Sequence, residues 1–217
     1  MKNIVIITSN SIRHNYFKLL FAANNDINVL KTYVESDSEF KLTLTKPKLS
    51  DLDNDVAMHF DARSNSEYDF FSDVVNLFED KSNSVFISKG DINKENFVND
   101  IVNLRPDLIV TYGCSIIRSK LLTYFNEQII NVHLGLSPYY FGSGTNFHCL
   151  VNNEFQFQGY TFMYLDKGID TGKIIHQERA VILPYDNPHQ IGNRSVSYTH
   201  LRAHETPEHL VCRLLLE

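Results

Sequence analysis

The fold is decided by the stretch Ile129-Ile130-Asn131-Val132-His133-Leu134-Gly135-Leu136-Ser137-Pro138, an apolar run that gains two polar side chains near its end. Side chains alternate across a strand, so Asn131 and His133 point to one face and Val132 to the other. In open α/β sheets, ligands bind outside the carboxyl ends of the strands. The stretch therefore predicts an active site at the end of a strand. The alternative is a buried histidine satisfied by a neighbour, beside a turn-forming asparagine.

The regions around this stretch alternate between strand and helix patterns. Strands are predicted at residues 4–8, 27–34, 85–87 and 108–111, and helices at 13–23, 68–78, 95–104 and 119–125. Residues 35–66 are polar and weakly periodic, which predicts an excursion with one or two short helices. Residues 159–165 and 173–183 predict an antiparallel pair, and a closing helix begins near Asp186-Asn187-Pro188. The order predicts an α/β fold with a mostly parallel sheet flanked by helices.

Composition narrows the class of protein. The chain has 217 residues, 43% of them hydrophobic, which suits a globular domain with its own core. No apolar run has the length of a membrane helix or the form of a signal peptide, so the cytoplasm is the expected location. Cys114, Cys149 and Cys212 have no metal-like spacing and are expected to be reduced thiols. The net charge of −6 argues against binding nucleic acid through the field of this domain alone.

The C-terminal segment looks foreign to the domain. Residues 196–217 resemble translated sequencing adapter, with two fixed outer blocks around Pro207-Glu208-His209. The predicted organisation is thus a domain over residues 1–195, truncated at its C-terminus, and a non-native tail over 196–217. The alternative is a short natural helix. The parent nucleotide sequence distinguishes the two, because a continuous genomic reading frame without an adapter match excludes an adapter origin.

A second stretch of the sequence contains a candidate site carboxylate, Asp170. Lys167-Gly168-Ile169-Asp170-Thr171-Gly172-Lys173 reads as a loop between strands, with two glycines that free the backbone. Asp170 alone is typical of a turn or a cap. Placed beside His133, its carboxylate could orient the imidazole or favour its protonated form.

Four linked motifs now resemble the formyltransferase family, which includes glycinamide ribonucleotide, methionyl-tRNA and sugar N-formyltransferases and formyltetrahydrofolate hydrolases. The motifs are Asn131–Pro138, Phe141–Gly144, Gly159–Phe162 and Gly168–Ile175. The resemblance is strong over residues 106–183 and rests on strand order alone over residues 1–105. It implies a Rossmann-like formyltransferase fold and 10-formyltetrahydrofolate as formyl donor, with no metal.

The resemblance also implies residue roles. Asn131 would donate a hydrogen bond to the oxyanion that forms when an amine attacks the formyl carbon. Protonated His133 would stabilise the same charge, and Asp170 would hold His133 charged and relay the proton of the amine. The pterin pocket would be lined by two segments whose members are Gly113, Cys114, Ser115, Ile116, Ile117, Arg118, Gly168 and Ile169. For Ile116 and Ile117, plain core packing is the alternative.

Departures from the family pattern bear on the acceptor. Phe141 stands where relatives often carry arginine, and the loop at residues 9–14 lacks the glycines that cradle a ribose phosphate, which disfavours glycinamide ribonucleotide. Arg13 and His14 could contact an anionic acceptor, although a solvated helix start is the commoner explanation. A small-molecule amine, with an amino sugar-nucleotide favoured, is the expected acceptor. The alternatives are methionyl-tRNA formylation, which needs a C-terminal RNA-binding domain, formyltetrahydrofolate hydrolysis, and a non-catalytic folate-binding module.

Overall fold

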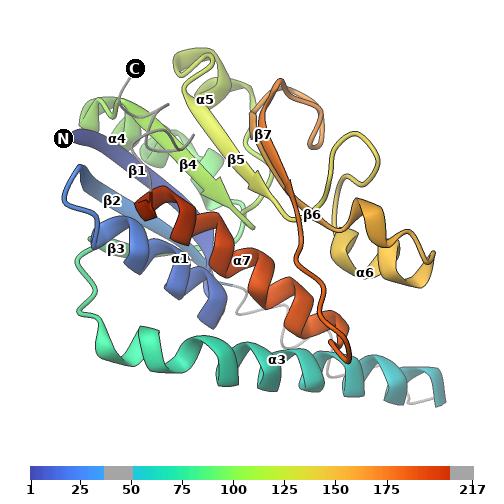
Figure 1. The fold of residues 1–217 in the computed structure, drawn as a ribbon. Helices are drawn as coiled ribbons and strands as arrows, with labels where there is room; N and C mark the ends of the chain where they lie inside the picture. Colours follow the sequence, from blue (N-terminus) through green and yellow to red (C-terminus); the bar gives the residue numbers. More distant parts are fainter. Residues whose placement is uncertain (37–50, 206–217) are drawn as a thin grey trace.

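A computed structural model describes residues 1–36 and 51–205 and contains one seven-stranded sheet in the order β3-β2-β1-β4-β5-β6-β7 (Figure 1). Neighbouring strands from β1 to β5 are parallel, whereas β6 is antiparallel to both β5 and β7. The predicted mostly parallel sheet with a C-terminal antiparallel pair is confirmed. The strands are β1 (Lys2–Ser9), β2 (Ile27–Ser36), β3 (Ser84–Ser88), β4 (Leu108–Tyr112), β5 (Ile129–His133), β6 (Gly159–Tyr164) and β7 (Ile174–Arg179).

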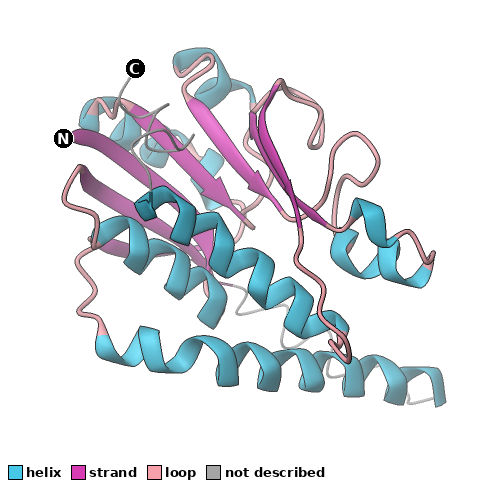
Figure 2. Cartoon of the chain, viewed as in Figure 1, coloured by secondary structure: helices cyan, strands magenta, loops and turns pink. Residues whose placement is uncertain are grey.

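Helices cover both faces of this sheet (Figure 2). One face carries α1, α3 and α7, and the other carries α4 and α5. Two single-turn 3-10 helices lie at Asp91–Asn93 and Phe155–Phe157. The α-helices are α1 (Ile12–Ala22), α3 (Asp51–Leu77), α4 (Glu95–Leu104), α5 (Ser119–Tyr124), α6 (Thr145–Val151) and α7 (Pro188–Glu205).

The apolar core divides into two clusters because strand side chains alternate between the faces. Ile4 and Ile6 of β1 belong to the cluster beneath α1, α3 and α7, and Val5 and Ile7 belong to the cluster beneath α4 and α5. All four side chains are completely buried. A strand that is apolar on both faces is typical of the centre of a parallel sheet. The site described below lies at the carboxyl ends of these central strands.

The segment after β2 differs from the prediction. Instead of short helices followed by a helix at 68–78, one helix, α3, runs continuously from Asp51 to Leu77, and residues 37–50 lie outside the described part. The apolar residues of α3 do not form one stripe: Phe71 is completely buried, but Met58 and Phe70 are exposed. Its periodicity is therefore weak in the sequence, and packing against α1 and α7 supports the helix instead.

Two smaller differences lie nearer the site. α6, which was not predicted, begins after Gly144, whose φ of +70° is a left-handed conformation that suits glycine. β7 ends at Arg179 rather than continuing to residue 183, and the chain then crosses to α7 in an irregular segment.

The start of α7 confirms the predicted cap. The Asn187 Oδ1 atom accepts hydrogen bonds from the backbone N–H groups of His189 and Gln190, at 3.0 and 2.9 Å. Gln190 Oε1 in turn accepts the backbone N–H of Asn187 at 3.0 Å, which completes a capping box with Pro188 as the first helical residue.

The same helix crosses residue 195, where the sequence predicts a change to foreign sequence. Val196 is 1% exposed and packs into the core beneath α7. Residues 206–217 of the predicted tail lie outside the described residues. The adapter origin of residues 196–217 stays a prediction, and the nucleotide sequence is its test.

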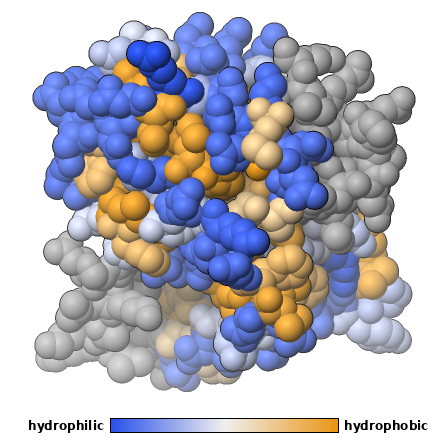
Figure 3. All heavy atoms as spheres, turned by 90° about the vertical axis from the view of Figure 1, so that its left-hand side faces the viewer, coloured by the Kyte–Doolittle hydropathy of each residue, from blue (hydrophilic) through white to orange (hydrophobic). Residues whose placement is uncertain are grey.

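On the side of the molecule shown in Figure 3, apolar residues reach the surface in separate areas among hydrophilic ones.

Within residues 1–36 and 51–205, no helix combines the length and apolar character needed to cross a bilayer. Cys114 and Cys149 are free thiols, as expected, whereas Cys212 lies outside the described part of the chain.

Candidate active site

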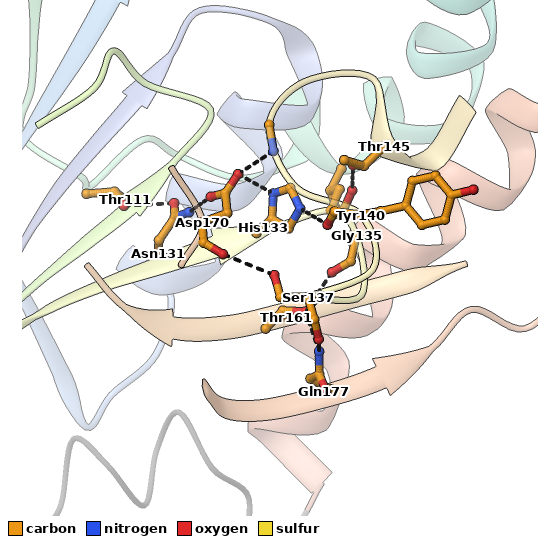
Figure 4. A network of polar contacts seen from close by, with 12 residues as sticks. Thr111, Asn131, His133, Gly135, Ser137, Tyr140, Thr145, Thr161, Asp170 and Gln177 are labelled. Atoms are coloured by element: carbon orange, nitrogen blue, oxygen red, sulfur yellow. Dashed lines mark hydrogen bonds and ion pairs between the residues drawn. The ribbon is translucent and has the colours of Figure 1, made fainter. Parts of the chain in front are cut away.

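The Asp170 carboxylate, in the loop between β6 and β7, contacts the end of β5 and the loop beyond it (Figure 4). Its Oδ1 accepts a 2.8 Å hydrogen bond from the Asn131 side chain, and its Oδ2 accepts a 2.8 Å bond from the backbone N–H of Gly142. The same Oδ2 lies 3.3 Å from His133 Nδ1. The three predicted residues are therefore brought together, and Val132 between them packs into the core, as strand alternation predicts.

Thr111, on the neighbouring strand β4, completes the orientation of Asn131. Its hydroxyl donates to Asn131 Oδ1 at 3.0 Å. An amide turned the other way would direct its oxygen at the Asp170 carboxylate. An ionised carboxylate accepts hydrogen bonds and has no hydrogen to donate, so that orientation would place two acceptors together. The two contacts thus keep the Asn131 NH₂ group on the Asp170 side, with one of its two hydrogens left over.

His133 lies between two acceptors. Its Nε2 is 3.0 Å from the backbone carbonyl oxygen of Tyr140, and because a carbonyl only accepts, Nε2 carries a hydrogen. Its Nδ1 faces Asp170, and the side chain is only 7% exposed. An imidazolium, with hydrogens on both nitrogens, satisfies both contacts. Gly135 makes room for the ring, because a Cβ there would lie 2.6 Å from His133 Nε2.

The loop that carries Asp170 is shaped by its own polar groups. Asp166 Oδ1 accepts hydrogen bonds from the Gly168 backbone N–H and the Thr171 hydroxyl, at 2.9 and 2.8 Å. A Cβ on Gly172 would lie 1.7 Å from a backbone oxygen of β6, so only glycine fits there. Asp170 itself has φ of +52°, an uncommon conformation that aspartate tolerates better than most residues. The loop therefore holds Asp170 in an uncommon backbone conformation. Such conformations are found more often at functional sites than elsewhere.

The antiparallel pair supports the loop after β5. The Thr161 hydroxyl of β6 donates to the Gly135 carbonyl at 2.6 Å, and Gln177 Nε2 of β7 donates to the Ser137 carbonyl at 2.6 Å (Figure 4). Ser137 precedes Pro138 through a cis peptide bond. Sequence reasoning missed Thr161 and Gln177, as it missed Thr111. For Thr111 and Thr161 the available signal was a polar residue within an otherwise apolar strand, whereas Gln177 lies among the polar residues of β7 and gave no such signal.

Asn131, His133 and Asp170 line a cavity of about 640 Å³ at the carboxyl ends of the parallel strands. Of the residues predicted to hold the pterin, seven line it: Gly113, Cys114, Ser115, Ile116, Ile117, Gly168 and Ile169. Arg118, the eighth, is exposed and is not among the lining residues.

The wall formed by these two segments is partly apolar. Ile116 and Ile169, one from each lining segment, are 62% and 53% exposed, so they present apolar surface to the cavity. Ile117 is 5% exposed and also belongs to the core cluster, so packing and lining coincide there. Loss of solvent around Cys114, followed by the nearby charge of Glu35, raises the pKa of its thiol, which keeps it protonated.

The first helix corrects one expectation. His14 is not solvated at the start of α1; it is 4% exposed, its Nδ1 is 2.6 Å from the Ser11 hydroxyl, and its ring centroid lies 4.7 Å from that of Tyr112. Burial, and then the charges of Arg13 and Arg63, hold the pKa of His14 well below 6.5. Arg13, by contrast, lines the cavity, with 23% of its side chain exposed.

Among the residues that the structure describes, no three His, Cys, Asp or Glu side chains cluster as metal ligands. Fold and site together define an α/β domain with an amide, an imidazole and a carboxylate at the carboxyl edge of its parallel strands.

The family follows from comparison. A model of the family described as "Formyl transferase" matches residues 38–204, and the chain belongs to that family. A methionyl-tRNA formyltransferase from Alkaliphilus oremlandii is 40% identical over 89 residues, which cover 40% of this chain and 28% of that protein. A GDP-perosamine N-formyltransferase from Brucella melitensis is 28% identical over 114 residues, covering 52% of this chain and 44% of the relative. The matched region thus spans less than half the length of these relatives.

Solved structures support the fold. Phosphoribosylglycinamide formyltransferase from Streptococcus pneumoniae superposes with a TM-score of 0.63 at 18% identity, covering 100% of both chains. A sugar N-formyltransferase from a Shewanella species superposes with a TM-score of 0.61 at 19% identity, covering 100% of this chain and 70% of the other. At these identities the similarity shows the formyltransferase fold alone.

Proposed function

We propose that this domain transfers a formyl group from 10-formyltetrahydrofolate to the amine of a small-molecule acceptor, with an amino sugar-nucleotide favoured. The observation that carries the proposal is the meeting of Asn131, His133 and Asp170 at the wall of one cavity. When bound, the folate supplies an activated formyl carbon. The two loops that carry Ile116 and Ile169 would hold its ring system.

Asn131 supplies the donor for the developing negative charge. One hydrogen of its NH₂ group is used by Asp170, and the second remains available on the cavity side. Because Thr111 and Asp170 fix the amide beforehand, little reorganisation is needed during the reaction. A donor fixed in this way typically lowers a barrier by about 3 kcal/mol.

His133 acts through its charge rather than through a free N–H. The Tyr140 carbonyl and the Asp170 carboxylate occupy its two nitrogens, so its protonated form places a positive charge in the wall without donating into the cavity. Asp170 keeps that charge in place. Through a water molecule, its carboxylate would also take the proton that the attacking amine must lose. The same proton would pass to the folate nitrogen, which leaves as tetrahydrofolate when its bond to the formyl carbon breaks.

The acceptor assignment rests on the composition of the first loop. The loop at residues 9–14 has no glycine to cradle a ribose phosphate, which disfavours glycinamide ribonucleotide. Methionyl-tRNA is the second candidate, favoured by the names of several of the relatives. Hydrolysis of the folate, or folate binding without turnover, are the remaining candidates.

One experiment separates these four functions. The purified chain is incubated with 10-formyltetrahydrofolate and, in turn, amino sugar-nucleotides, methionyl-tRNA and no acceptor, and the products are identified by mass spectrometry. A formylated sugar-nucleotide supports the favoured assignment. Formylated methionyl-tRNA supports the second candidate, and free formate without an acceptor supports the hydrolase. Folate binding with none of these products contradicts catalysis.

A further inference from the structure

A second polar cluster lies on the cavity wall formed by α1, α3 and α7. The buried carboxylate of Glu67 on α3 contacts two arginines through the same oxygen: Oε1 lies 2.7 Å from Arg63 Nε and 3.6 Å from Arg13 Nη1. The Glu67 side chain is 7% exposed, whereas those of Arg13 and Arg63 are 23% and 34% exposed. One carboxylate thus fixes two guanidinium groups that both line the cavity.

The two guanidinium groups retain donors for a further partner. The Arg63 Nη1 and Nη2 atoms have no hydrogen bond with other described residues, and Arg13 Nε is buried without a partner among them. The Tyr112 hydroxyl, also on this wall, is buried and without a partner within the described part of the chain. Arg13 Nε and the Tyr112 hydroxyl are closed to solvent, whereas the Arg63 side chain is 34% exposed, so the Nη atoms of Arg63 are the donors that a ligand in the cavity can reach.

The charge balance of this wall favours an anion. Arg13 and Arg63 outnumber Glu67, and the two other acidic residues that line the cavity, Asp166 and Asp170, belong to the opposite loop. Guanidinium groups bind phosphate oxygens through paired hydrogen bonds, and they keep their charge at any ordinary pH. Two guanidinium groups held by a shared carboxylate therefore match a phosphate or pyrophosphate group.

An aromatic group lies on the same wall and suits the rest of a small ligand. The ring centroid of His59 on α3 lies 5.0 Å from those of Phe147 on α6 and His189 on α7. All three residues line the cavity, and Phe147 is 42% exposed. Such rings can pack against a sugar or a base. Asn193 on α7 donates to the Ser66 carbonyl at 2.9 Å and so fixes α7 against α3 at this point.

We infer that Arg13 and Arg63 form an anion subsite on the cavity wall formed by α1, α3 and α7, and that the acceptor is a phosphorylated small-molecule amine. The inference rests on the proposed function for the amine, but the anion subsite rests on the Arg13–Glu67–Arg63 contacts alone. The subsite lies within a cavity shared with Asn131 and His133, and it offers two arginines rather than an extended basic surface. A single compact anion fits it better than a nucleic acid backbone, which engages many basic residues.

The direct test is a calorimetric titration of the full chain with inorganic pyrophosphate at low salt. Wild-type protein is expected to bind, and Arg13→Gln and Arg63→Gln are each expected to weaken binding about tenfold or more, as for loss of a charge-assisted hydrogen bond. Arg179→Gln is the matched control, because Arg179 is exposed on β7 and does not line the cavity. It should change affinity less than twofold.

Arg63→Lys, which keeps the charge but not the paired geometry, should recover part of the lost affinity. If Arg13→Gln does not fold, the two Arg63 variants decide the matter. The subsite is overturned if folded wild-type protein does not bind pyrophosphate, or if both Arg63 variants bind it as the wild type does.

Turnover separates the subsite from the proposed function. With a phosphorylated amino sugar as acceptor, Arg63→Gln should raise KM about tenfold or more and leave kcat within a small factor. Pyrophosphate binding through the arginines, without formylation of any amine, overturns the proposed function and leaves the subsite standing. Formylation of methionyl-tRNA together with inert phosphorylated amines overturns the small-molecule acceptor.

Discussion

The side-chain amide of Asn131 donates a 2.8 Å hydrogen bond to the carboxylate of Asp170, although the two residues are 39 positions apart in the sequence. β6 is antiparallel to β5 and ends beside the start of that strand, where Tyr164 pairs with Ile130. The loop that follows β6 therefore folds back along β5 to bring Asp170 to Asn131 and His133. The same carboxylate faces the imidazole of His133 at 3.3 Å. One carboxylate therefore orients both groups that would stabilise negative charge.

Thr111→Val tests the orientation of Asn131. Removing the hydroxyl leaves the Asn131 oxygen without its donor, a loss of about 1 kcal/mol, so kcat should fall about fivefold with KM little changed. The measurement is the steady-state release of tetrahydrofolate. Thr8→Val is the matched control, because Thr8 is also completely buried and donates to the Tyr112 carbonyl at 2.9 Å, but does not line the cavity. Equal kcat for the two variants contradicts the role of Thr111.

Gly135→Ala tests the fit of the His133 ring. The added Cβ would lie 2.6 Å from His133 Nε2 and 2.9 Å from the Thr145 side chain, so the ring or the loop must move. We expect a loss of about 1–3 kcal/mol in the free energy of unfolding, measured with urea, and reduced turnover. Gly192→Ala in α7 is the comparison, since its nearest neighbour would be 3.8 Å away and alanine favours a helix. Unchanged stability in Gly135→Ala would falsify this packing.

His14 predicts a pH dependence of stability. Burial, then Arg13 and Arg63, lower the pKa of His14 in the folded state, so the unfolded chain binds the proton more readily. The stabilisation is present above the ordinary pKa of 6.5 and declines as the pH falls below it. The decline is at most about 1.4 kcal/mol per pH unit for this one group.

The measurement compares urea unfolding of the wild type and His14→Gln at about pH 7.5 and about pH 5.5. Glutamine can still bond to Ser11 but does not titrate in this range. The wild type should lose more stability than the variant between the two conditions. The same loss in both proteins means that His14 is not the group responsible.

Asn187→Ala tests the start of α7. The substitution removes the two hydrogen bonds that the side chain accepts from His189 and Gln190, and should cost about 1 kcal/mol of unfolding free energy. Thermal and urea unfolding measure it. Asn103→Ala, at an exposed position of α4, serves as the control and should change stability by a few tenths of a kcal/mol at most. A cap without effect in both measurements contradicts the assignment.

Much of the fold could be predicted because β1, β4 and β5 are apolar on both faces, which marks buried parallel strands. Asn131 and His133 stood out because they interrupt such a run, and the motif around Asp170 linked them to a distant loop. Thr111 could not be identified as a site residue in the same way, because its contact with Asn131 depends on the register between β4 and β5.

The contacts among Arg13, Arg63 and Glu67 were harder to predict for a physical reason. α3 buries Phe71 but exposes Met58 and Phe70, so its sequence has no amphipathic pattern that predicts a long helix. Arg63 and Glu67 are four residues apart on that helix, and their partner Arg13 comes from α1. Only the packing of α3 against α1 brings the three charges together.

The central claim is that Asn131, His133 and Asp170 act on one formyl carbon. Its most direct test is the rate of tetrahydrofolate formation from 10-formyltetrahydrofolate and an accepted amine, for wild type and for alanine variants at the three positions, each shown by circular dichroism and thermal unfolding to be folded. We expect every variant to lose about a hundredfold or more in kcat. A folded His133→Ala protein with near wild-type kcat contradicts the account.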